Sequence, residues 1–199
     1  TVATLMYVLS NHFHLFPPVM LPMSWVDRAV PFVPQTVWIY TSEFILFILT
    51  YALSRDHRNA NKYLYSFLAL QTVSVAIFVI YPTTFPRAQF PLPADLDPLT
   101  RALFAHLRVT DTPANCAPSL HVSSCYLSSF VFLDERRRLF PLFFLWASAI
   151  AFTTLTTKQH YLVDVALGFV FAAIFYWIFH RWMNYRTYGR VETGVQANR

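Results

Sequence analysis

The chain alternates between long apolar stretches and short polar or proline-rich joints. A membrane-spanning helix needs about 20 mostly apolar residues, and six stretches approach that length. They cover residues 1–16, 37–53, 63–81, 118–133, 139–157 and 161–180. None has the alternating apolar and polar positions of a membrane-barrel strand. We therefore expect one domain over residues 1–199, an all-α, polytopic integral-membrane bundle of six transmembrane helices.

The joint of residues 82–117 is long for a connection without secondary structure. Within it Asp97 is suited to cap a helix, and Pro98 to occupy the first helical position. The apolar residues that follow fall on one face, namely Leu99, Ala102, Leu103 and Leu107. We predict a short amphipathic helix on the outer interface. It would be a structural lid or, alternatively, a gate for substrate.

Composition agrees with a membrane protein, because 56% of residues are hydrophobic and 13% are charged, whereas soluble domains carry about 25% charged residues. Ten of the 15 Lys and Arg residues lie in residues 54–62, residues 134–138 and the tail from Arg181. Excess Lys and Arg mark the cytoplasmic side. We therefore expect both termini to be cytoplasmic. The net charge of +5 then reflects orientation, and no nucleic-acid partner is expected.

Acidic residues inside apolar spans are costly and are candidates for function. Asp164 follows His160 by four residues, so on a helix the two side chains would share one face. A carboxylate there fixes the imidazole tautomer and makes the other ring nitrogen more basic. The pair is a candidate nucleophile or base, and the alternative is a satisfied structural His–Asp pair.

A second cluster, Pro118-Ser119-Leu120-His121, opens the fourth predicted span. With Pro118 as first helical residue, the N–H groups of the first turn form an anion site. Ser119 adds a hydroxyl donor and His121 an acid. The alternative is an ordinary helix start with an interfacial histidine.

Two cations complete the candidate set. Arg87 follows the third span, and Lys158 stands two residues before His160. Either could bind phosphate or could anchor lipid headgroups. All these candidates lie at outward ends of spans. Phosphate binders, a histidine with its carboxylate and a second histidine are what phosphoryl transfer through a covalent histidine intermediate requires.

These residues resemble the type-2 phosphatidic acid phosphatase superfamily of membrane lipid phosphatases. That superfamily has three motifs: Lys-x6-Arg-Pro, Pro-Ser-Gly-His, and Ser-Arg-x5-His-x3-Asp. The second matches residues 118–121, the third matches at His160 and Asp164, and the first is reduced to Arg87. The residues that depart from the motifs are Ile80, Ala88, Leu120, Thr153 and Thr154. The two retained motifs look more like the inositol phosphorylceramide synthase and sphingomyelin synthase branch.

The resemblance implies a catalytic core over residues 63–183 and a lipid phosphatase. His160 would attack phosphorus, Asp164 would orient it and His121 would protonate the leaving alkoxide. The phosphate would be held by Arg87, Ser119 and Lys158, the last in place of a missing motif cation. The partners would be a lipid phosphate and the bilayer, with no metal or cofactor. The alternative is a phosphotransferase that moves a phospho-headgroup between lipids. We expect a bacterial inner-membrane protein with its site facing the periplasm.

The sequence gives less support to two other classes of function, a transporter and a metal enzyme. A proton-coupled transporter would add Glu43, His12 and His14 to a pathway, but the apolar part has one Gly and no repeated halves. A metal enzyme would have to use His121, His160 and Asp164, since His12 and His14 point to different helix faces. We interpret Glu43 as a packed or lumen-facing structural residue.

Overall fold

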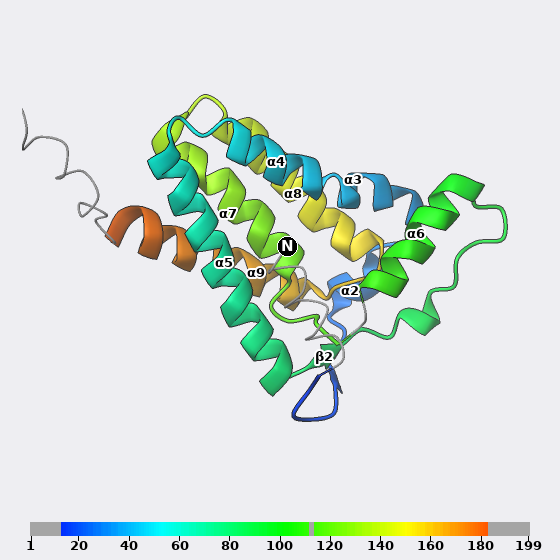
Figure 1. The fold of residues 1–199 in the computed structure, drawn as a ribbon. Coiled ribbons are helices and arrows are strands. Elements are labelled where there is room, and N and C mark those ends of the chain that lie inside the picture. The colour runs from blue at the N-terminus through cyan, green and yellow to red at the C-terminus, as the bar shows by residue number, and fades with distance from the viewer. Residues whose placement is uncertain (1–12, 112–113, 183–199) are drawn as a thin grey trace, which may run out of the picture.

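Helices make up most of the described chain (Figure 1). The computed structural model describes residues 13–111 and 114–182. Its α-helices are α2 (Trp25–Ala29), α3 (Val37–Thr41), α4 (Glu43–Ala52), α5 (His57–Ile80), α6 (Pro98–Thr110), α7 (Leu120–Glu135), α8 (Phe140–Thr156) and α9 (Leu162–Tyr176). Shorter elements are the parallel strands β1 (Val19–Met20) and β2 (Thr83–Thr84), the 3-10 turns η1 (Pro34–Thr36) and η2 (Arg87–Gln89), and the π-helical turn η3 (Trp177–Trp182).

Helix α7 is the centre of the bundle and contacts α4, α5, α8 and α9 (Figure 1). It is buried on nearly every face although it is rich in serine. Three of its serine hydroxyls donate to carbonyls one turn earlier, among them Ser123 to Leu120 at 3.1 Å and Ser128 to Ser124 at 2.7 Å. Because these small side chains satisfy themselves locally, α7 can be packed on all sides.

The beginnings of α7 and α9 are joined closely. The Ser119 N–H donates to the Asp164 carbonyl at 3.1 Å. One turn further along α9, a Cβ on Gly168 would lie 2.7 Å from the Ser119 carbonyl oxygen. Glycine is therefore required at this crossing, and the close approach fixes both helix starts relative to each other.

Four of the predicted spans correspond to single helices, namely α5, α7, α8 and α9 with its π-helical extension. The predicted span of residues 37–53 is divided into α3 and α4 at Ser42, whose hydroxyl donates to the Ile39 carbonyl at 2.6 Å and accepts from the Trp146 indole. The span predicted at residues 1–16 lies mostly outside the described residues.

Two of the described helices, His57–Ile80 and Leu162–Arg181, are long and apolar enough to cross a membrane, by length and composition. Helix α8 is apolar but shorter. This agrees with a membrane protein, although the structure does not establish six spans.

The predicted helix in the long joint is present as α6 (Figure 1). Asp97 is its N-cap and accepts from the Thr100 N–H at 2.9 Å, with Pro98 in the first helical position. Hydrogen bonds from Thr100 lower the pKa of Asp97. The apolar face of α6 packs on α3 through Phe104 and Leu107, while Leu99 stays exposed.

Candidate active site

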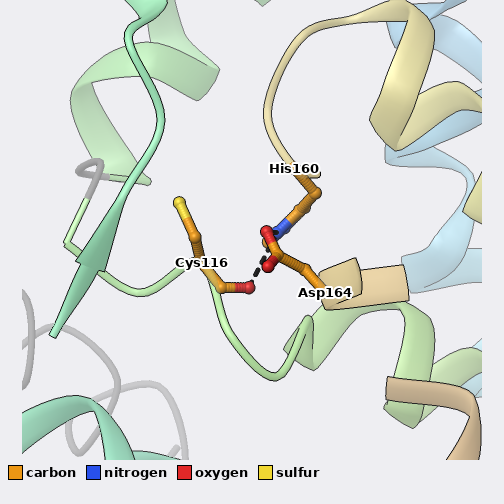
Figure 2. A group of neighbouring side chains, drawn as sticks. All are labelled: Cys116, His160 and Asp164. Carbon is orange, nitrogen blue, oxygen red and sulfur yellow. Dashed lines mark hydrogen bonds and ion pairs between the residues drawn. The ribbon is translucent and has the colours of Figure 1, made fainter. Parts of the chain in front are cut away.

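His160 lies in the loop between α8 and α9 and is 3% exposed. Its Nδ1 is 3.0 Å from the carbonyl oxygen of Cys116 (Figure 2). A carbonyl only accepts, so Nδ1 carries the proton. In the neutral ring the lone pair is then on Nε2, which makes no hydrogen bond within the described residues.

The predicted pairing with Asp164 is present, with Oδ2 3.4 Å from Nδ1 of His160. The reason given for it, a shared helix face, is wrong. Helix α9 begins at Leu162, so His160 precedes the helix and Asp164 lies in its first turn. The same Asp164 oxygen accepts from the Tyr161 N–H at 2.9 Å. The fully buried carboxylate thus lies beside the imidazole and can balance a positive charge on it.

Backbone contacts hold the loop in place. The N–H groups of Gln159 and His160 both donate to the Thr154 carbonyl, at 3.0 and 3.3 Å. Lys158 has a left-handed backbone, with φ of 55°. Thr154 stands where the superfamily motif has Arg, and its hydroxyl donates to the Ala151 carbonyl. Here this position shapes the loop instead of presenting a cation.

His121 lies in the first turn of α7, and its ring centroid is 5.8 Å from that of His160. Its Nδ1 is 2.8 and 2.9 Å from the two carboxylate oxygens of Glu43. A carboxylate accepts, so Nδ1 is again the protonated nitrogen. Nε2 then faces the site. The ring of Tyr40 packs against the imidazole, with the two ring centroids 4.7 Å apart.

Glu43 is buried and packed, as predicted for a structural residue, and it is also the hydrogen-bond partner of a candidate catalytic residue. It is 3% exposed. The sequence did carry a signal, because Glu43 is an isolated acid inside an apolar stretch and such residues are candidates for function by default. Its partner was not apparent, since Glu43 and His121 lie on different helices far apart in the chain.

Arg87 is buried and pairs with Asp111, a residue that sequence reasoning missed. Its Nη2 is 3.0 Å from Asp111 Oδ2, and its Nη1 donates to the Asp111 backbone carbonyl. The same carboxylate oxygen is 3.9 Å from Nε2 of His121. No motif spacing pointed to Asp111, which directly follows α6.

The two remaining candidates make structural contacts. Lys158 Nζ donates to the carbonyls of Asp27 and Val30, at 2.7 and 2.6 Å. Its amine therefore caps the end of α2, and burial lowers its pKa. The Ser119 hydroxyl is the N-cap of α7 and accepts from the Val122 N–H at 3.4 Å. Pro118 precedes this cap and does not occupy the first helical position.

Cys116, His160 and Asp164 offer potential metal-ligand atoms within 4.8 Å of one another. In Figure 2 the carbonyl oxygen of Cys116 faces the imidazole, whereas the sulfur points away from it. Burial, followed by the charge of Asp164, raises the pKa of the Cys116 thiol. Because Nδ1 of His160 donates to the Cys116 carbonyl and the Cys116 sulfur points away, these three residues fit a hydrogen-bonded histidine better than a metal centre. Of the residues that a metal enzyme was expected to use, His121 is bound to Glu43.

The structure thus brings His160, Asp164, His121, Glu43, Asp111 and Arg87 to one end of the bundle. The class defined by this fold and site is a largely helical protein with long apolar helices, in which a buried histidine, His160, lies beside a half-buried one, His121. The chain belongs to the PAP2 superfamily, whose family model matches residues 5–178. Enzymes of this superfamily are generally metal-independent phosphatases. No curated protein matches the chain significantly, and the family match does not distinguish a branch.

Proposed function

We propose that this protein is a lipid phosphate phosphatase that works through a phosphohistidine on His160. The observation that carries the proposal is the state of that ring. Its Nδ1 is committed to the Cys116 carbonyl, and Nε2 has no hydrogen-bond partner among the described residues. A buried imidazole in this tautomer is a ready nucleophile.

In the first step, the Nε2 lone pair of His160 forms a bond to phosphorus while the bond from phosphorus to the leaving oxygen breaks. Nε2 of His121 gives its proton to that oxygen, so an alcohol leaves. The ring of His160 becomes positively charged, and Asp164 at 3.4 Å balances that charge. In the second step, neutral His121 takes a proton from water as the water oxygen attacks phosphorus. The N–P bond breaks and phosphate is released.

A cavity of about 460 Å³ beside the site supports a lipid as substrate. It lies between α5 and α9, and Ile77, Val163, Leu167 and Phe171 are among its apolar lining residues. Its wall includes Ala117 and Pro118, which directly follow the cysteine whose carbonyl holds His160. A molecule with an apolar tail in this groove and an anionic head at His160 would match both environments.

We place the protein in a membrane, with six spans, both termini in the cytoplasm and the histidine end of the bundle facing outward. In a bacterium this would be the inner membrane, with the site open to the periplasm. The arrangement rests on the distribution of Lys and Arg along the chain and on the two long apolar helices.

The charges at the site favour the phosphotransferase as a second candidate. Three carboxylates surround the histidines, those of Glu43, Asp111 and Asp164. Among the described candidates Arg87 is the cation present there, because the Lys158 amine is bound at α2. A dianionic phosphate monoester would be repelled more strongly than a monoanionic phosphodiester headgroup. An alcohol acceptor would then replace water in the second step.

The test is an assay of the purified full-length protein with a radiolabelled lipid phosphate, with and without alcohol acceptors, followed by a search for label on histidine after quenching in base. We expect His160→Ala to abolish both turnover and labelling, while the exposed His106 on α6 provides a matched His106→Ala control. Orthovanadate should inhibit. Free phosphate released without acceptor supports the phosphatase, and product formed only with acceptor supports the transferase. Full activity of His160→Ala refutes both.

A further inference from the structure

The Asp111 carboxylate lies between Arg87 and His121. We propose that this carboxylate occupies the position of a substrate phosphate oxygen, so that it is a built-in competitor which sets the affinity of the site for anions. This inference rests on the proposed function, because it takes Arg87 and His121 as the groups that receive the phosphate.

The geometry defines the position closely. One oxygen, Oδ2 of Asp111, is 3.0 Å from the Arg87 guanidinium and 3.9 Å from Nε2 of His121. That nitrogen makes no hydrogen bond within the described residues. Arg87 and Asp111 are both buried. Oδ2 of Asp111 therefore lies between Arg87, which would hold the phosphate, and His121, which would protonate the leaving oxygen.

The chemistry of the two anions is the same at this point. A carboxylate and a phosphate both present anionic oxygens that accept from a guanidinium N–H, as Asp111 Oδ2 accepts from Nη2 of Arg87. A second anion brought to Arg87 would also meet the charges of Glu43 and Asp164, and repulsion between like charges at short range is strong in a buried site. Substrate phosphate must therefore displace the Asp111 carboxylate from Arg87 in order to bind.

The pairing of Arg87 with Asp111 has a physical reason of its own. A buried guanidinium without a partner is costly, and the Asp111 carboxylate supplies a partner. Phosphate then binds more weakly, because its interaction with Arg87 must replace the existing ion pair between Arg87 and Asp111.

The test is Asp111→Asn in the full-length protein. The amide keeps the size of the side chain and removes its charge. We expect the inhibition constant of orthovanadate and the KM for lipid phosphate to fall, each by about tenfold, because a neutral amide is displaced more easily than a carboxylate. Asp111→Glu, which keeps the charge, should bind vanadate no more tightly than the wild type. Asp95→Asn, an exposed acid in the same joint, is the matched control.

Direct binding of vanadate, measured by calorimetry on folded protein, distinguishes failure of the competitor role of Asp111 from failure of the proposed function. If the wild type binds vanadate and turns over lipid phosphate but Asp111→Asn does not bind vanadate more tightly, the competitor role is overturned. Weaker binding would instead assign Asp111 to the positioning of Arg87. A fall in kcat with unchanged affinity would assign it to the chemistry. If the wild type neither binds vanadate nor turns over lipid phosphate, the proposed function fails as well.

Discussion

Both histidines of the site are held through Nδ1, but the oxygens that hold them differ in charge. His160 donates to a neutral backbone carbonyl, with the Asp164 carboxylate slightly farther away at 3.4 Å. His121 donates directly to the Glu43 carboxylate. The Glu43 carboxylate, in direct contact, can balance a positive charge on the ring of His121. This difference suits His121 to be the acid and His160 the nucleophile.

Glu43 is expected to act through His121. Glu43→Gln should lower kcat by about 100-fold, the order of a general-acid contribution, with a much smaller change in KM. Glutamine cannot balance the charge of the protonated ring, and only one of its two terminal groups can accept from Nδ1. The measurement is steady-state kinetics on a lipid phosphate.

Glu135 supplies the control for this variant. It is also a buried glutamate, at the far end of α7, and accepts from the Arg55 N–H. Glu135→Gln should leave kcat within a few-fold of the wild type, and Glu43→Asp should restore part of the lost rate. If the role of Glu43 were purely structural, Glu43→Gln and Glu135→Gln would lower the stability of the protein equally, and Glu43→Gln would not lower kcat more than Glu135→Gln does.

Lys158 is expected to stabilise the fold, in contrast to its predicted role in phosphate binding. Lys158→Met leaves the Asp27 and Val30 carbonyls without their donor, which costs about 1–3 kcal/mol of stability for buried acceptors. The measurement is the free energy of unfolding in detergent, with Lys62→Met on α5 as control. A tenfold rise in KM without loss of stability would instead restore the phosphate-binding role.

At the scale of helices, the crossing of α7 and α9 decides where the site residues lie. Gly168→Ala would bring a Cβ to 2.7 Å from the Ser119 carbonyl and 3.0 Å from Val122 Cβ. We expect a loss of about 1–3 kcal/mol in stability from this overpacking, together with lower activity, since Asp164 moves with α9. Thermal unfolding and turnover measure the two effects.

The sign of the stability change makes this test sharp. Helix propensity alone favours alanine over glycine by about 1 kcal/mol, so without the steric contact Gly168→Ala would stabilise the protein. Ala166 is exposed on the same helix, and Ala166→Gly measures the propensity effect there. Stabilisation by Gly168→Ala would contradict the close crossing.

The sequence predicted the helices better than it predicted the hydrogen-bond partners of the site residues. Apolar runs indicated α5, α7, α8 and α9, and Asp97-Pro98 indicated the start of α6, because these signals are local. The hydrogen bond from His160 to the Cys116 carbonyl was beyond such reasoning, since every residue has a carbonyl and only the fold selects one. Lys158 lies beside His160 in sequence, but its left-handed backbone and its bonds to α2 take the amine elsewhere.

At the scale of the whole molecule, the two ends of the bundle differ in chemistry. The histidines and α6 lie at one end of α7 and α8, and the loop between α7 and α8, with Arg136 to Arg138, lies at the other (Figure 1). Helix α7 has 16 residues, or about 24 Å, which is somewhat less than the roughly 30 Å of a bilayer core. Because the basic end is expected to be cytoplasmic, the histidine end would lie close to the opposite interface.

Cysteine labelling in intact cells tests this orientation. Leu99→Cys places a thiol on the exposed face of α6, and Arg137→Cys places one in the basic loop. We expect a membrane-impermeant maleimide to label the first in intact cells and the second only after permeabilisation. The wild type gives the background, because Cys116 and Cys125 are buried. Reversed labelling would invert the orientation and place the site in the cytoplasm, and labelling of both positions in intact cells would rule out a bundle that crosses the membrane between them.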